Sequence, residues 1–183
     1  GLACACCETA KEVAPGEMVT FELVFSMEET DVTGEKLVAD HYARQESMIQ
    51  AAGLQDPLAQ QLVLAADAYI ARRDSTNGKT LLAGYPLFSD WGRDTMISLP
   101  GITMVTGRFE ECKSILRTFA KYIKNGLLPN LFPEGDENPM YNSADAPLLF
   151  VNTVYEYLEY SRDEEFLEEI LPSLEQVVKA YQN

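Results

Sequence analysis

Apolar residues recur every three to four positions through much of the chain, and this spacing most constrains its fold. The pattern is clearest over residues 109–123, where it predicts an amphipathic helix. A last helix is predicted over residues 163–181, whose glutamates at 164, 165, 168 and 169 form a solvated face. Residues 143–160 are apolar on nearly every side, which is typical of a helix buried all round. Residues 36–51 and 57–73 are further predicted helices. Amphipathic helices that alternate with an all-round apolar one indicate two concentric layers, an α/α toroid.

The start of the chain has a different period. Residues 17–26 alternate apolar and polar side chains, which predicts a β-strand. A boundary is expected near residues 30–35, followed by about six helices in antiparallel pairs. Residues 76–79 form a tight-turn signal, and Pro172 should end or kink the last helix near Leu171.

Charge and hydropathy exclude several classes of protein. The sequence has 14 Lys and Arg against 29 Asp and Glu, so its net charge is −15, and a nucleic-acid partner is disfavoured. No run of about 18 apolar residues predicts a membrane helix. Nothing resembles a signal peptide, so we expect a cytoplasmic protein. The first residue is Gly1 rather than Met, which suggests a piece of a longer protein.

Cysteine and histidine are too sparse for most metal or nucleophile sites. Cys4, Cys6 and Cys7 crowd the N-terminus, and Cys112 stands alone among apolar residues. These are expected to be free thiols, because no second Cys-x-x-Cys motif pairs with the one that Cys4 and Cys7 form. The single histidine, His41, lies in a polar stretch and is expected at the surface. Any catalysis should therefore use carboxylates, and no metal or organic cofactor is expected.

The first polar segment at a predicted helix start is residues 84–95. It holds the only tryptophan, Trp91, followed closely by Arg93 and Asp94. An aromatic face beside charged hydrogen-bonding groups can bind a sugar. Alternatively, Asp90 or Asp94 caps the helix, Arg93 pairs with a carboxylate and Trp91 fills the core. Composition alone leaves both interpretations open.

The second such segment covers residues 128–135 and 141–147. Ser143 is a predicted N-cap that places Asp145 in the first helical turn, where the helix dipole lowers the pKa of a carboxyl group. A stabilising role would need nothing more. A general acid would need the opposite shift, from burial or from a second carboxylate.

Together these segments closely resemble the amylo-α-1,6-glucosidase module of glycogen debranching enzymes. The resemblance rests on residues 84–97 with their Trp-Gly-Arg-Asp motif, on residues 128–135, and on the Tyr-Asn-x-x-Asp-Ala motif at 141–146. It implies an (α/α)6 barrel that hydrolyses α-1,6-linked glucosyl branch stubs of glycogen or branched α-glucan oligosaccharides with inversion. Residues 35–183 would then be the N-terminal half of the barrel, and residues 1–34 the strand-rich tail of a preceding β-sandwich domain.

The resemblance also assigns roles to single residues. Asp145 would be the general acid, whereas the family's general base has no counterpart here, so the chain alone is expected to be inactive. Pro147 departs from the small or hydroxyl residue usual after the Asp-Ala pair. The implied substrate-binding residues are Trp91, Arg93, Asp94, Asn130, Glu134, Tyr141 and Asn142.

Two other functions stay open. The same pocket could belong to a different inverting α-glucosidase, of the glucoamylase or trehalase kind. A non-catalytic carbohydrate-binding fragment would keep the aromatic and charged residues without turnover. Because half a barrel would expose an apolar edge, we also expect self-association.

Overall fold

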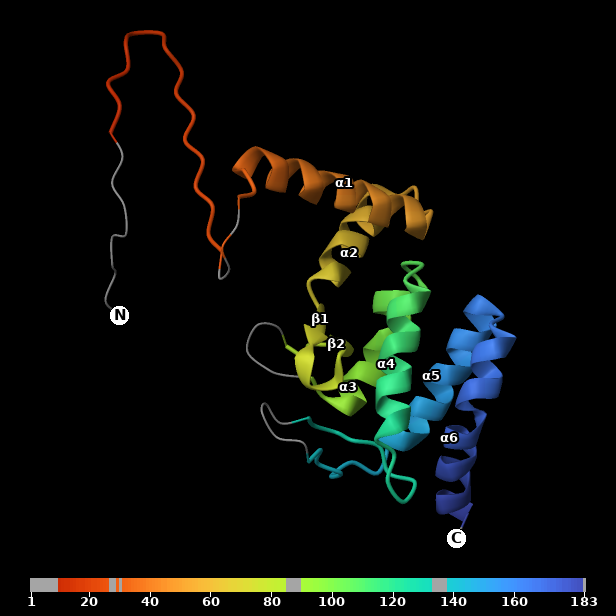
Figure 1. The fold of residues 1–183 in the computed structure, drawn as a ribbon. Coiled ribbons are helices and arrows are strands. Elements are labelled where there is room, and N and C mark those ends of the chain that lie inside the picture. The colour runs from red at the N-terminus through yellow and green to blue at the C-terminus, as the bar shows by residue number, and fades with distance from the viewer. Residues whose placement is uncertain (1–9, 27–28, 30, 85–89, 133–137, 183) are drawn as a thin grey trace. The chain divides into compact units, whose positions relative to one another are not determined.

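The computed structural model describes residues 10–26, 29, 31–84, 90–132 and 138–182. Helices make up 59% of the structure, and the described part holds six α-helices and one two-stranded sheet (Figure 1). The prediction of a mainly helical chain with about six helices is confirmed. The chain divides into two compact units, Gly1–Arg44 and Gln45–Asn183. No helix in the described ranges is long and apolar enough to span a membrane.

The strand predicted over residues 17–26 is wrong. These residues belong to no strand, and Phe21, Leu23 and Phe25 are 58%, 67% and 82% exposed. Alternating side chains specify a strand only where a second strand supplies hydrogen bonds and a surface to cover, and no other segment described in this unit does so. The helix predicted over residues 36–51 is confirmed as α1 (Gly34–Ala52).

The helix predicted over residues 57–73 is correct only in its first part. It is α2 (Pro57–Asp67), with Pro57 in the first turn and the Asp56 carboxylate accepting from the Ala59 N–H at 2.9 Å. Its remainder forms β1 (Ile70–Arg73), which pairs antiparallel with β2 (Gly78–Leu81). The predicted turn explains the change, because Asn77 has φ 49° and reverses the chain onto β1.

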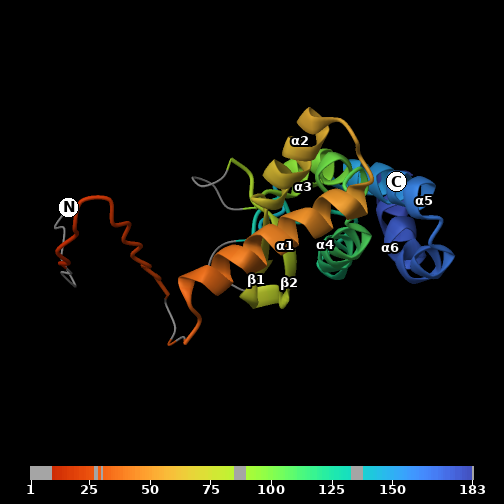
Figure 2. The same cartoon turned by 90° about the horizontal axis from the view of Figure 1, so that it is seen from above.

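Four helices surround the main core. They are α3 (Gly92–Leu99), which continues into a π-helical turn at Pro100–Met104, α4 (Phe109–Lys121), α5 (Ala146–Ser161) and α6 (Glu164–Gln182). Helix α5 contacts α3, α4 and α6, and both views show α4, α5 and α6 side by side (Figures 1 and 2). The largest buried side chains of this core come from all four helices and include Met96, Leu99, Ile115, Leu116, Phe119, Phe150, Tyr157, Phe166 and Ile170.

Two details of the last helices differ from the predictions. Helix α5 is not buried all round, since Leu148 and Tyr155 on one face are 50% and 61% exposed and no described element covers them. Helix α6 continues through Pro172 instead of ending near Leu171. Pro172 lies on the solvent side, where water can satisfy the carbonyl group of Glu168 that lacks an N–H partner.

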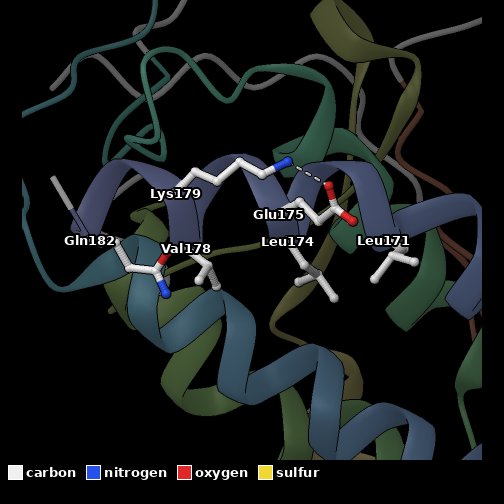
Figure 3. Close-up of a pocket in the computed structure, with 6 residues that line it drawn as sticks. All are labelled: Leu171, Leu174, Glu175, Val178, Lys179 and Gln182. Carbon is white, nitrogen blue, oxygen red and sulfur yellow. Dashed lines mark hydrogen bonds and ion pairs between the residues drawn. The ribbon is translucent and has the colours of Figure 1, made fainter.

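Helix α6 carries a second apolar face besides the one that it buries. Leu171, Leu174 and Val178 point to one side of the helix, away from the ion pair between Glu175 and Lys179 at 2.7 Å (Figure 3). Together with Glu175, Lys179 and Gln182, these three residues line an open pocket of about 430 Å³. Leu174 is partly buried against the core, whereas Leu171 and Val178 are 45% and 41% exposed, so the outer part of this face is uncovered by the described elements.

Candidate functional site

The site begins where two distant loop segments pair. Trp91 forms an isolated antiparallel bridge with Leu131, which in turn bridges Met140. The N–H of Gly92 donates to the carbonyl oxygen of Asn130 at 2.9 Å, and the N–H of Asn130 donates to that of Met140 at 2.8 Å. These bonds hold the start of α3 against the segment that leads to α5.

Gly92 allows this close approach. A β-carbon at Gly92 would lie 2.1 Å from the carbonyl oxygen of Pro129, a backbone atom that cannot swing aside. Any side chain at this position would therefore separate the two segments. The glycine between Trp91 and Arg93 is a steric requirement of the site.

Arg93 and Asp145 meet at the open side of the paired segments. The guanidinium binds the carboxylate through two contacts, Nε to Oδ2 at 2.8 Å and Nη2 to Oδ1 at 2.9 Å. Ser143 joins them, because its hydroxyl donates to Asp145 Oδ1 and accepts from Arg93 Nη2 at 3.4 Å. The Arg93 and Asp145 side chains are about half exposed, at 49% and 52%, so solvent and ligands can reach the pair.

The surroundings of Asp145 keep its carboxyl group ionised. Hydrogen bonds from Ser143 and from Arg93 lower the pKa of Asp145 to about 2. The predicted N-cap is wrong, because Asp145 itself occupies the N-cap position of α5 and Ser143 lies two residues before it. The Ser143 hydroxyl still accepts from the Ala146 N–H at 3.3 Å. The shift is opposite to the one that a general acid needs, and it matches the alternative in which Arg93 pairs with a carboxylate.

Asn130 and Tyr141 are engaged in the framework of the site. The buried Asn130 side chain accepts from the Arg93 N–H at 3.2 Å and donates to Asn142 Oδ1 at 3.1 Å. The Tyr141 hydroxyl donates to the carbonyl oxygen of Tyr122 at 2.6 Å, and burial raises its pKa. Asn142 is exposed beside them.

Asp94 faces a different place from Arg93. Consecutive residues of a helix point in different directions, and Asp94 lines an open pocket of about 390 Å³ together with Tyr69, Gly84 and Ser98. Trp91 is half-buried at the bridge. The structure therefore brings Arg93, Asn130, Asn142 and Asp145 together and places Asp94 in a neighbouring pocket. Glu134 lies outside the described residues, as do Cys4, Cys6 and Cys7.

The remaining sequence expectations concern His41 and Cys112. His41 is exposed, as predicted. Cys112 is a buried free thiol, and burial raises its pKa to about 12. Within the ranges that the structure describes, no three His, Cys, Asp or Glu side chains are grouped as metal ligands would be.

Sequence reasoning missed two residues beside the site, Arg73 and Asp90. They form a buried ion pair directly before Trp91. The sequence marked Asp90 only as a candidate cap, and nothing distinguished Arg73 from Arg72 next to it.

The low pKa of Asp145 gives an expected response to acid. Its folded-state pKa is below the unfolded value of about 4, so ionised Asp145 favours the folded state above that pH. This contribution is lost as the pH falls from about 4 to about 2. We expect the urea midpoint of the wild type to fall more over this window than that of Asp145→Asn. Equal falls in the two proteins would contradict the ion pair.

Comparison with known proteins gives a family match that covers the segments of this site. The family described as amylo-alpha-1,6-glucosidase matches residues 64–183, more than half of the chain, and the chain belongs to this family. A relative is the glycogen debranching enzyme of Saccharomyces cerevisiae, which is 40% identical over 110 residues. That alignment covers 54% of this chain and 7% of the yeast protein, so the chain corresponds to a small part of its relative.

Proposed function

We propose that the chain supplies the general-acid side of a glycoside hydrolase site that cleaves α-1,6-linked glucosyl branch stubs of glycogen or branched α-glucans. The observation that carries the proposal is the solvent-accessible pairing of Arg93 with Asp145 at the start of α5. Membership of the amylo-α-1,6-glucosidase family supports the reaction class. No cofactor is needed, because inverting hydrolysis requires two carboxyl groups and a water molecule.

In this proposal Arg93 controls the protonation of Asp145. A guanidinium that binds sugar hydroxyls in a forked geometry has to give up its carboxylate partner. Asp145 then loses one of the two hydrogen bonds that lower its pKa, and burial by the bound sugar together with the charge of the general base raises that pKa further, so that the carboxyl group can hold the proton that the leaving glycosidic oxygen needs. Substrate binding would thus convert Asp145 from a carboxylate into an acid.

The rest of the site is assigned on the same basis. Trp91, Asp94, Asn130, Glu134, Tyr141 and Asn142 are proposed to line the sugar pocket. We place the general base outside this chain, roughly 6.5–9.5 Å from Asp145 across the sugar, as inversion requires. Residues 35–183 would be the N-terminal half of a cytoplasmic (α/α)6 toroid, and residues 1–34 the tail of a preceding β-sandwich domain.

The experiment that tests this function measures glucose release by the full-length protein that carries this chain. Substrates with α-1,6 branch stubs, α-1,4 chains and trehalose are compared, and the product anomer is followed by NMR. We expect release from the α-1,6 stubs as the β-anomer, and none by the 183 residues alone. Preference for α-1,4 chains or trehalose would indicate the glucoamylase-like or trehalase-like alternative.

A non-catalytic carbohydrate-binding role is the second candidate. It is favoured by the pKa of Asp145, which lies near 2 in the free protein. Isothermal titration with maltooligosaccharides separates the two functions. Binding by the full-length protein without any turnover of branched substrate would support the binding role.

We also propose that further helices of the toroid cover the apolar face of α6 in the full-length protein. Left uncovered, Leu171 and Val178 should drive association of the 183-residue chain at micromolar concentration. Light scattering should detect dimers or larger species, and Leu171→Glu should reduce them. Leu58→Glu on α2, at an apolar position that is more exposed (70% against 45% for Leu171), is the control that should not. A monomeric wild type would contradict this proposal.

A further inference from the structure

A buried ion pair lies directly before the segment that opens the site. Arg73, the last residue of β1, contacts Asp90 Oδ2 through Nη2, and the two side chains are only 11% and 5% exposed. Thr80 of β2 completes the group. Its hydroxyl donates to Asp90 Oδ2 at 2.6 Å and accepts from Arg73 Nη2 at 3.0 Å.

Stability alone is a poor explanation for this group. Removing two charges from water is costly, and apolar side chains of similar volume often serve a core equally well. The cost is visible at Arg73, where burial lowers the pKa to about 10. Its Nη1 atom is also buried without a hydrogen-bond partner among the described residues. The position of the ion pair in the fold therefore says more about its role than its contribution to stability does.

Arg73 contacts both segments that pair at the site. The antiparallel bridge between Trp91 and Leu131 puts Asp90 opposite Phe132. The Arg73 guanidinium pairs with Asp90 and also lies 4.1 Å from the centre of the Phe132 ring. A single side chain thus holds the residue before Trp91 and the residue after Leu131.

The other side of the bridge is held by Asn130. Its carbonyl and side-chain oxygens accept from the N–H groups of Gly92 and Arg93 at 2.9 and 3.2 Å. The bridge is therefore fixed from both sides. Arg93 follows it directly in the chain, and its side chain pairs with Asp145. Loosening either side would let the start of α3 shift.

We propose that Arg73 and Asp90 are positioning residues, whose buried ion pair fixes the Trp91 segment and thereby aligns Arg93 with Asp145. Neither residue need touch a ligand. The alignment itself is a property of the folded chain, and only its consequence for hydrolysis rests on the function proposed above.

Trp91 provides a direct readout, because it is the only tryptophan in the 183 residues. In Arg73→Met and Asp90→Asn, quenching of Trp91 fluorescence by acrylamide should rise about twofold or more, since the freed segment opens locally. Far-UV circular dichroism at the same temperature should stay unchanged. If Arg73→Met does not fold, Thr80→Val is the milder variant, because it keeps both charges and removes the bridging hydroxyl.

Arg108 offers a matched control. Its side chain is also 11% exposed, and it pairs with Asp67 of α2 at 2.7 Å. Arg108→Met therefore breaks a comparable pair on other elements, and Trp91 quenching should keep its wild-type value. Equal rises in Arg108→Met and Arg73→Met would indicate general loosening and overturn the proposal. Wild-type quenching in both Asp90→Asn and Thr80→Val would also overturn it.

Steady-state kinetics of the full-length protein test whether a misplaced Arg93 lowers the rate of hydrolysis. Misplacement of a binding group by about 1 Å can cost on the order of 100-fold in rate, so Asp90→Asn should lower kcat much more than it raises KM. Arg108→Met should leave kcat unchanged, and an equal loss of kcat in both variants would count against positioning. If the wild-type protein hydrolyses no glucan, the proposed function fails, whereas Trp91 quenching still decides the positioning role.

Discussion

Asp145→Asn in the full-length protein is expected to remove nearly all hydrolysis of α-1,6 branch stubs. A sugar leaving group needs a proton, and a positioned general acid contributes about 100- to 10,000-fold to the rate. The same variant should keep much of its activity on glucosyl fluoride, whose leaving group needs no protonation. Steady-state kinetics on both substrates measure this difference.

Asp163→Asn is the matched control for this experiment. Asp163 is another carboxylate at a helix start, where it accepts from the Phe166 N–H at 3.0 Å, and its pKa is also lowered. Its loss should leave hydrolysis unchanged. Equal loss on both substrates for Asp145→Asn, with an unaltered melting temperature, would assign Asp145 to binding and move the acid elsewhere.

Gly92→Ala should be the most disruptive small substitution at the site. The new methyl group would approach the Pro129 carbonyl oxygen to 2.1 Å, so the paired segments must separate. Overpacking of this kind costs about 1–3 kcal/mol. For a chain of this size each kcal/mol lowers the melting temperature by about 2–4 °C, which thermal unfolding will detect.

Gly101→Ala is the control for that substitution. A β-carbon at Gly101 meets nothing within 4 Å, so its melting temperature should match or slightly exceed the wild-type value. Gly92→Ala should also increase the exposure of Trp91 to acrylamide, because the bridge to Leu131 is lost. A variant with wild-type stability and quenching would show that the two segments are less tightly apposed than described.

The spacing of apolar residues correctly predicted the helices that bury one face. It failed for segments whose secondary structure depends on pairing or contact with a distant part of the chain. The spacing over residues 109–123 predicted α4 because that helix packs its apolar face on the core. Residues 70–73 form a strand because β2 lies beside them, whereas residues 17–26 have no such neighbour in the described part of their unit. Local sequence contains no information on which neighbour will be present.

The candidate site was likewise predictable only where local sequence is sufficient. The motifs identified Arg93 and Asp145 separately, and one of the two interpretations of Arg93 included a carboxylate partner. Which carboxylate it would be depends on how α3 and α5 pack. Arg73 was missed because Arg72 beside it has the same side chain, although strand geometry sends the two to opposite faces. The Arg72 side chain is 72% exposed and pairs with Asp74, whereas the Arg73 side chain is only 11% exposed.

The tie between α3 and α5 has a consequence for the order in which the chain folds. Arg93 and Asp145 are 52 positions apart, so their contact closes a long loop, whereas α5 and α6 are neighbours in sequence. Local pairs form faster than distant ones because less chain entropy is lost. The buried hydrogen bond from Thr153 to the Met96 carbonyl oxygen, at 3.0 Å, fastens α3 to α5. We therefore expect the α5–α6 hairpin to form before the α3–α5 contact that assembles the site.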